Sequence, residues 1–401
     1  MKRRELLKSG LVIAGSAMLA GCGKEEEKTV AVSSDDFTIE PKQTDVYKLS
    51  VPMLFYEDAI KRFAKWNDEH KKIKIETLYN SIPWPLSESY NEWLQLCRGG
   101  SNPRITSFAD YERYVKCSFD HGFKTCYLMN SPKPFNMKDL ATFKDDLYKL
   151  LDFLWKIGVD NIKVANSQVA VLINEHNPAF KLTSSTIFEY NSIGQYAQLL
   201  ELYPNFVNFG VAKNQNQNFR FLSNLRKRFP DKIIEIMVDE GCLKNCPTRV
   251  SCMSCSSTGY FKHGCRLTGK NKARAKVMNG AVQPWDYAYY SAIGINNFKS
   301  VPMHQRASDE DEPHVKVIMD VVEYGIDSTV GKRYIRELFP FLKNNNFDPK
   351  EVISYLPSTE HFIKHGHECD SKCGVECNYC FKKIEALEKE YKKAKISLTR
   401  T

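Results

Sequence analysis

Two groups of cysteines are the residues of this sequence best suited to chemistry. The first is EGCLKNCPTRVSCMSC at residues 240–255, and Cys265 follows it. The second is HGHECDSKCGVECNYC near the C-terminus, with the pattern Cys-x3-Cys-x3-Cys-x2-Cys at Cys369, Cys373, Cys377 and Cys380. Short repeated spacings of this kind are more typical of metal sites than of disulfides. Thiolates are soft ligands that suit both zinc and iron–sulfur centres.

Other interpretations of these thiols remain open. An oxidising compartment would permit disulfides. Residues 373–380 also fit the cluster loop of radical S-adenosylmethionine enzymes, but here only a charged helical tail follows that loop, not a barrel. Two centres with four thiolates each would use eight of the nine clustered cysteines and leave one without a metal. Cys252 and Cys255 compete with Cys265 as ligands of the first centre. Zinc is the main rival at the C-terminal group, where His361, His365 and His367 widen the choice of ligands.

An alternating pattern of strands and helices must position these groups. Eight β-rich runs are separated by amphipathic helical stretches such as DLATFKDDLYKLLDFLWKIG at 139–158. Such repeats over roughly 260 residues match a closed (β/α)8 TIM-like barrel. No Gly-x-Gly-x-x-Gly turn or phosphate loop supports the open, nucleotide-binding alternative. The predicted strand runs are 47–54, 73–80, 123–130, 161–167, 180–188, 206–213, 233–240 and 295–302.

Such a barrel carries its functional site on the loops after the strands, at the carboxyl-terminal face. We predict Glu240 and Asn166 as catalytic residues there. Asparagine also caps helices, so each asparagine taken alone has a structural alternative. Cys242 and Cys246 directly follow the seventh predicted strand and belong to the same face. Further strand-end residues are predicted to line the substrate pocket, namely Asn80, Glu189, Asn191, His304 and Arg306, with Asn130, Lys213 and Asp239 also at strand ends.

The N-terminus has the features of a targeting signal. The pair Arg3-Arg4 is followed by the apolar run LVIAGSAMLA and by Leu19-Ala20-Gly21-Cys22, and the run is too short to span a bilayer comfortably. This order resembles a twin-arginine lipoprotein signal, in which lipidated Cys22 would anchor the exported chain to a membrane. An uncleaved membrane-proximal helix and a chance start on a cytoplasmic protein are the alternatives. Export of already folded protein would suit a centre assembled in the reducing cytoplasm.

Composition sets the domain organisation. With 401 residues, 42% hydrophobic and 26% charged, the chain has room for one large domain and an accessory module. We predict a signal at 1–22, a flexible tether at 23–45, the barrel at 46–335 and a cysteine-rich helical module at 336–401. The net charge of +9 is spread along the chain without an aromatic–basic signature, which argues against nucleic acid as a partner.

One stretch resembles a known family. The segment NFRFLSNLRKRFPDKIIEIMVDEGCLKNCPTR, followed by VQPWDYAYYSAIGINNFK, resembles peptidase family U32, the collagenase-like barrel proteins, over roughly residues 140–300. The resemblance implies a (β/α) barrel and one of two activities. Some members are described as collagenase-like peptidases, and others hold a 4Fe-4S cluster and assist oxygen-independent hydroxylation. It implies cluster ligation by Cys242 and Cys246, with Cys265 next.

The sequence lacks the machinery of known peptidase types. It has no His-Glu-x-x-His helix, no Gly-x-Ser-x-Gly elbow and no cysteine with an evident histidine partner. We therefore expect an iron–sulfur protein with one or two 4Fe-4S clusters, acting in oxygen-independent hydroxylation or related redox chemistry. Its partners would be a small-molecule or peptide substrate and a redox or homologous protein. A collagenase-like peptidase and a zinc-stapled, non-catalytic binding lipoprotein are the alternatives.

Overall fold

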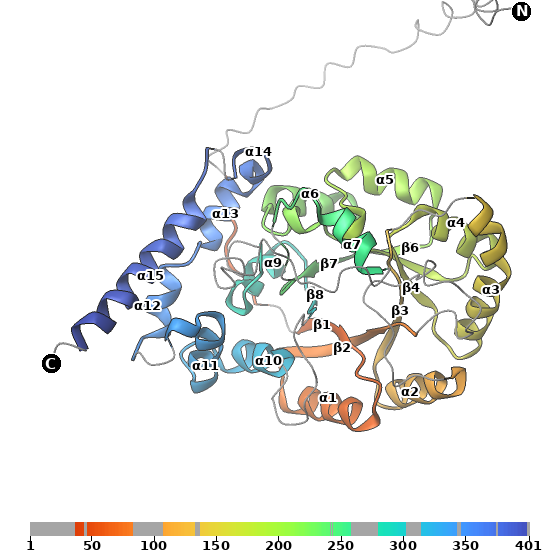
Figure 1. Cartoon of the computed structure of the whole chain (residues 1–401), viewed down its shortest axis with the longest axis horizontal. Helices are drawn as coiled ribbons and strands as arrows, with labels where there is room; N and C mark the ends of the chain where they lie inside the picture. Colours follow the sequence, from red (N-terminus) through yellow and green to blue (C-terminus); the bar gives the residue numbers. More distant parts are fainter. Residues whose placement is uncertain are drawn as a thin grey trace, which may run out of the picture. The chain divides into compact units, whose positions relative to one another are not determined.

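The computed structural model describes residues 37–43, 46–82, 107–132, 137–240, 242, 244–257, 280–301, 314–342, 346–373 and 376–398. All eight predicted strands are present, each pairs in parallel with the next, and β1 pairs with β8 to close a barrel (Figure 1). The predicted (β/α)8 fold is therefore confirmed. The strands are β1 (Tyr47–Pro52), β2 (Ile73–Asn80), β3 (Lys124–Met129), β4 (Asn161–Val164), β5 (Lys181–Ser184), β6 (Phe206–Gly210), β7 (Ile233–Met237) and β8 (Asn297–Lys299).

Helices between the strands surround the barrel (Figure 1). The first helix illustrates why these segments are helical and pack on the barrel. It buries Ile60, Phe63 and Trp66, which are spaced three residues apart and therefore lie on one face, turned to the strands. Acidic residues in its first turn interact favourably with the helix dipole. These helices are α1 (Glu57–Glu69), α2 (Phe108–Asp120), α3 (Met137–Lys156), α4 (Ser167–His176), α5 (Ile193–Leu202), α6 (Phe219–Arg228), α7 (Arg249–Ser257), α9 (Tyr287–Ala292) and α10 (His314–Tyr324).

The strands have an apolar outer face and a polar inner face. Ile162 and Val164 of β4 and Ile234 and Ile236 of β7 are fully buried in the main core, which packs against the helices. The residue between each pair is charged and also buried: Lys163 in β4 is 3% exposed and Glu235 in β7 is 8% exposed. Since successive side chains of a strand point to opposite faces, these charged residues face the barrel interior.

Further helices follow α10: α11 (Thr329–Leu338), α12 (Pro349–Ser354), α13 (Thr359–His365), α14 (Cys369–Lys372) and α15 (Tyr379–Leu398). The predicted barrel boundary at residue 335 falls inside α11. Helix α13 packs against α6, and the Thr359 hydroxyl donates a hydrogen bond to Asp286. A Cβ atom on Gly366 would lie 2.0 Å from the carbonyl oxygen of Gln217, so two backbones meet at a position that only glycine fits. The C-terminal helices are thus joined closely to the barrel.

Packing begins before the end of the predicted tether. The Lys42 N–H donates to the Ala288 carbonyl at 3.0 Å, and the Arg220 guanidinium lies 5.3 Å from the centre of the Phe37 ring. Two residues within the predicted tether of 23–45 thus find partners on α6 and α9. The predicted signal and Cys22 lie outside the described residues. Within the described part of the chain, no helix is long and apolar enough to cross a membrane.

Candidate functional site

Four charged residues meet at the carboxyl-terminal mouth of the barrel. Glu189 follows η1 (Thr186–Phe188) after β5, Lys213 opens η2 (Lys213–Gln215) after β6, Glu240 follows β7, and Arg249 opens α7. We call Glu189, Lys213, Glu240 and Arg249 the mouth cluster. Three successive strand-to-helix loops bring these residues together, because the carboxyl ends of parallel strands share one face.

Arg249 is the centre of the mouth cluster. Its Nη1 lies 2.8 Å from Glu240 Oε2, and its Nε donates a hydrogen bond to Glu189 Oε1. Lys213 Nζ donates to the backbone carbonyl of Glu240. The side chains of Arg249 and Glu240 are 4% and 1% exposed, whereas that of Glu189 is 22% exposed. Glu189 is therefore the carboxylate of the cluster that solvent or a ligand can reach.

Burial shifts the proton affinities of this cluster. It raises the pKa of Glu189 above its usual value, although the Arg249 charge opposes the change. Burial also lowers the pKa of Lys213 to about 8. For Arg249, burial acts to lower the pKa, but the two carboxylates outweigh it and raise it. A carboxyl and an amine with pKa values shifted toward neutrality can exchange protons with a bound ligand.

Glu189 also has an uncommon backbone conformation. Its φ of 52° and ψ of 40° lie in the left-handed region, a backbone conformation that residues other than glycine rarely adopt. Such a conformation costs on the order of 1–3 kcal/mol and persists where surrounding contacts hold it. The bond from Arg249 to its carboxylate is such a contact. The hydrogen bond from Arg249 thereby holds the Glu189 side chain at the mouth of the barrel.

Two of the predicted asparagines have structural roles. Asn166 is 7% exposed, and its side-chain oxygen caps α4 by accepting a hydrogen bond from the Gln168 N–H at 2.9 Å. Asn80 is 4% exposed and accepts a hydrogen bond from the Tyr111 hydroxyl. The structural alternative that the sequence left open is thus observed for Asn166, and Asn80 is held within the packing between β2 and α2.

The remaining predicted pocket residues do not join the mouth cluster in the described part of the chain. Asn191 is exposed, and its backbone N–H donates to Gln195 Oε1 at 2.8 Å, next to the capping box of α5. His304, Arg306 and Cys265 lie outside the described residues. Of the predicted pocket, the described contacts therefore bring together Glu189 and Glu240.

The first cysteine group lies next to the mouth cluster. Cys242 is half-buried and packs against Ala165, Ile187 and Met253. In its thiolate form Cys242 acts to raise the pKa values of Lys213 and Arg249. Cys246 is also half-buried, and its Sγ lies 3.4 Å from the Thr248 hydroxyl. The two thiols are thus at the carboxyl-terminal face, as predicted from their position after β7.

The second cysteine group surrounds one small cavity of about 30 Å³. Cys373 and Cys377 are joined by an isolated β-bridge. Burial raises the pKa of Cys380 to about 12, and the neighbouring thiols Cys369, Cys373 and Cys377 add to that effect. We call this the thiol cavity. Its lining consists of Cys369, Cys373, Cys377 and Cys380 with Gln217, Lys244, His361, Phe362, Asn378, Tyr379 and Phe381.

The two cysteine groups, remote in sequence, approach one another in the fold. Lys244 lines the thiol cavity, and Asn245 Nδ2 donates to the Cys369 carbonyl at 3.1 Å. Both residues lie between Cys242 and Cys246 in the chain. The loop after β7 therefore contacts the mouth cluster at one end and the thiol cavity at the other. Among the described residues, no group of three or more His, Cys, Asp or Glu side chains is already arranged to hold a metal ion.

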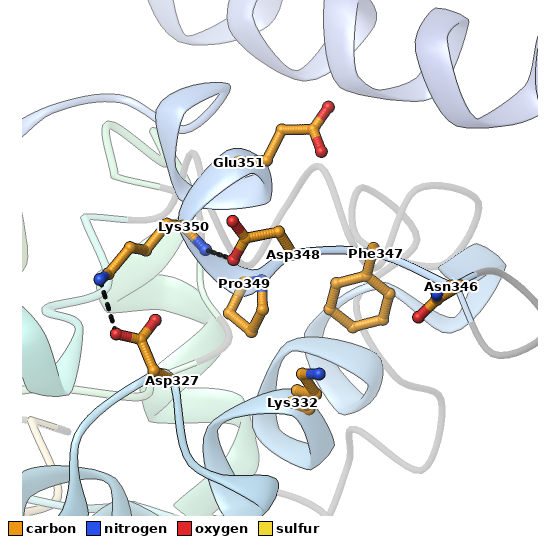
Figure 2. A pocket seen from close by; sticks show the side chains of 8 residues that line it. All are labelled: Asp327, Lys332, Asn346, Phe347, Asp348, Pro349, Lys350 and Glu351. Carbon is orange, nitrogen blue, oxygen red and sulfur yellow. Dashed lines mark hydrogen bonds and ion pairs between the residues drawn. The ribbon is translucent and has the colours of Figure 1, made fainter.

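A separate hollow of about 600 Å³ lies on the C-terminal helices, and Figure 2 draws the side chains that line it. Lys350 Nζ lies 2.7 Å from Asp327, and the Lys350 N–H donates to Asp348, the cap of α12. These bonds tie α12 to the turn before α11, so Asp327, Asp348 and Lys350 have structural roles. The hollow is lined by Asp327, Lys332, Asn346, Phe347, Asp348, Pro349, Lys350 and Glu351.

A second charged group lies inside the barrel and was not predicted from the sequence. We call Lys163, Glu235 and Lys299 the interior cluster. Lys163 Nζ donates to Glu235 Oε1, and the Ser50 hydroxyl donates to Glu235 Oε2 at 3.0 Å. A signal was present: the strands NIKV, IIEIM and NFK each carry a charged residue within apolar neighbours. Since both faces of parallel barrel strands are buried, such a charge must lie inside the barrel.

Comparison with known proteins shows likeness of fold alone. No protein-family model and no curated protein matches the chain. The chain is similar to the structure of the U32 peptidase Mk0906, with 13% identity and a TM-score of 0.43 over 67% of this chain and 97% of that one. It is also similar to PbGH5A, a glycoside hydrolase family 5 enzyme from Prevotella bryantii B14, with 8% identity and a TM-score of 0.37 over 72% and 99% of the two chains. The barrel that the resemblance to family U32 implies is present in the structure, and the chemistry of the mouth must be argued from its own residues.

Proposed function

We propose that the chain is an iron–sulfur redox protein of the U32-like barrel type, acting in oxygen-independent hydroxylation or related chemistry on a small-molecule or peptide substrate. The observation that carries this proposal is the thiol cavity. Four thiols from one short segment line a single space, and four cysteine thiolates are the usual ligands of a 4Fe-4S cluster. A redox protein would supply the electrons.

The donor set of the thiol cavity fits such a group. Cys369, Cys373, Cys377 and Cys380 would hold it, and loading would draw their sulfur atoms together, since ligation and local folding are coupled. The Lys244 ammonium lines the same cavity and would offset the negative charge of the thiolates. When bound, the cluster would supply single-electron transfer. A first centre on Cys242, Cys246 and Cys265 stays a prediction, because Cys265 lies outside the described residues.

The mouth cluster would bind the substrate and move protons. Glu189 is the group we assign to proton transfer, because its carboxylate is partly exposed and burial raises its pKa. Arg249 would fix the position of that carboxylate, and Glu240 would keep Arg249 in place. The polar groups at the mouth suit a substrate with hydrogen-bonding groups. Glu240 was predicted as catalytic, but its burial favours a positioning role.

Metal analysis of the full chain, produced and purified without oxygen, tests the proposal. We expect visible absorbance that bleaches on reduction, and about four irons and four sulfides per centre. Replacing Cys373 and Cys377 together by Ala should remove the absorbance of the C-terminal centre. The matched control is Cys117→Ala, because Cys117 is a half-buried thiol on α2, outside both cysteine groups.

The outcomes separate the alternatives. Retention of all iron and absorbance in the Cys373 and Cys377 variant would overturn the assignment of the thiol cavity. Zinc without iron would favour the zinc-stapled binding lipoprotein, and hydrolysis of peptides by iron-free protein would favour a peptidase. The variant with Cys242→Ala and Cys246→Ala counts the centres: loss of half the iron indicates two, and no loss indicates one.

Export is a separate part of the proposal. The order of the Arg3-Arg4 pair and the Leu19-Ala20-Gly21-Cys22 sequence supports twin-arginine translocation followed by lipidation of Cys22. Cell fractionation of the full chain and of Cys22→Ala tests it. We expect the first in the membrane fraction and the second released from it. The cytoplasmic alternative is supported if both proteins stay soluble in the cytoplasm.

A further inference from the structure

The interior cluster places two buried lysine amines near one another. Lys163 lies on β4 and Lys299 on β8, which are opposite strands of the closed barrel. Lys163 nevertheless reaches across the barrel interior to Glu235 on β7, the strand that pairs with β8, so its ammonium lies near the Lys299 amine. Both lysines are buried, at 3% and 4% exposure. Lys299 Nζ also lies 4.0 Å from the centre of the Tyr79 ring.

The charges of this cluster do not balance if both amines are protonated. Glu235 accepts a hydrogen bond from Lys163, so the single carboxylate is the counterion of that lysine. Two buried ammonium groups beside one carboxylate leave one positive charge without a counterion, and burial favours the neutral form of that amine. Burial first, and then the Lys163 charge, lower the pKa of Lys299 to about 7, whereas Glu235 and Cys126 act in the opposite direction. The pKa of Lys163 is raised, since Glu235 outweighs the burial that opposes it.

We propose that Lys299 is a nucleophilic amine that condenses with the carbonyl group of a small aldehyde or ketone entering at the barrel mouth. A lysine that is desolvated and beside a second cation is the usual arrangement for imine formation. Lys299 is the last residue of β8, and Tyr79 is the last but one of β2, so the amine lies in the layer next to the mouth. This activity goes beyond the proposed redox function and does not depend on it.

The step balances with groups present in the cluster. The neutral Lys299 nitrogen attacks the carbonyl carbon, and the oxygen leaves as water with one proton from that nitrogen and one from Lys163. The products are a protonated imine on Lys299, a neutral Lys163 and one water. The number of charges is unchanged, and the Glu235 carboxylate, 8% exposed, remains in place to balance the cation.

Reductive trapping on the full chain tests the proposal. The protein is incubated at pH 7 with acetaldehyde and cyanoborohydride, and the labelled lysines are identified by peptide mass spectrometry. The reference is Lys61 on α1, whose side chain is 54% exposed. An ordinary surface amine is about 0.1% neutral or less at pH 7. We therefore expect Lys299 to be labelled at least about tenfold faster than Lys61, even with restricted access.

The pH profile and one variant sharpen the test. Labelling of Lys299 should level off above about pH 8, one unit past its pKa of about 7, while labelling of Lys61 continues to rise. Lys163→Met removes the adjacent cation and should move the Lys299 profile to higher pH, with circular dichroism as the check of folding. Labelling of Lys299 no faster than that of Lys61 would overturn the proposal, and so would labelling only after urea unfolds the chain.

Discussion

The barrel contains two buried charge clusters that differ in one respect. The mouth cluster has two cations, Lys213 and Arg249, and two carboxylates, Glu189 and Glu240. The interior cluster also has two cationic side chains but only the carboxylate of Glu235. When each buried cation has a carboxylate as its counterion, the paired charges hold the side chains in position. A buried amine without a counterion tends to lose its proton. The missing counterion therefore favours the neutral form of Lys299, whose pKa falls to about 7, more than that of Lys213, whose pKa falls to about 8.

Removing the central cation of the mouth cluster should have the largest effect. Arg249→Ala leaves Glu189 and Glu240 as close carboxylates without their partner, and we expect a loss of about 3–5 kcal/mol in the free energy of unfolding. Urea unfolding at pH 7 measures it. The control is Arg113→Ala, because Arg113 is 56% exposed and its surface ion pairs should contribute less than about 1 kcal/mol. Equal losses in both variants would contradict the central role of Arg249.

Removing the counterion of the interior cluster should have an intermediate effect. Glu235→Gln keeps a hydrogen-bond acceptor for Lys163 and Ser50 but removes the charge, and we expect a loss of about 1–3 kcal/mol. Because Glu235 acts to raise the pKa of Lys299, the labelling profile of Lys299 should also move to lower pH. An unchanged labelling profile would mean that the Glu235 carboxylate does not affect the pKa of Lys299. Glu76→Gln is the control, since Glu76 pairs with Lys48 and Lys124 elsewhere on the barrel strands.

A pH dependence of stability is expected at the junction with the C-terminal helices. Burial raises the pKa of Asp286 from 3.8 to about 7, so the folded state binds more protons than the unfolded state between these values. Stability should therefore fall as pH rises from about 4 to about 7. Lys299 has the opposite sign in another window: its lowered pKa makes stability rise from about pH 7 to 10. In Asp286→Asn, the free energy of unfolding should lose its fall over pH 4–7 and keep the rise above pH 7.

The strands were predictable because their signal is local. Runs such as IIEIM need only their own composition to be recognised, and the turn signals between them set the repeat. Glu189 and Glu240 were predictable from their positions at strand ends. What the sequence could not supply was which strand-end groups meet. Arg249 reaches both carboxylates only because the loop after β7 returns over the mouth, and that path depends on contacts far apart in the chain.

Polar strand ends also have two uses that sequence cannot separate. Asn166 and Glu189 both follow barrel strands, yet Asn166 caps the helix that follows it and Glu189 extends to Arg249. Lys163 and Lys299 were overlooked for a related reason. A lysine in a strand is usually at a solvated edge, and only closure of the barrel turns that position into an interior one.

The pairing of β1 with β8 has a consequence for how the chain is made. The register joins Lys48 with Asn297, so the last barrel strand completes a sheet that the first one began. During synthesis β1 and β7 present unpaired edges until β8 leaves the ribosome, and such edges invite pairing with other chains. Contacts so distant in sequence also form slowly. A nascent chain of this protein is therefore open to aggregation for most of its translation, and a chaperone that shields sheet edges would raise its yield.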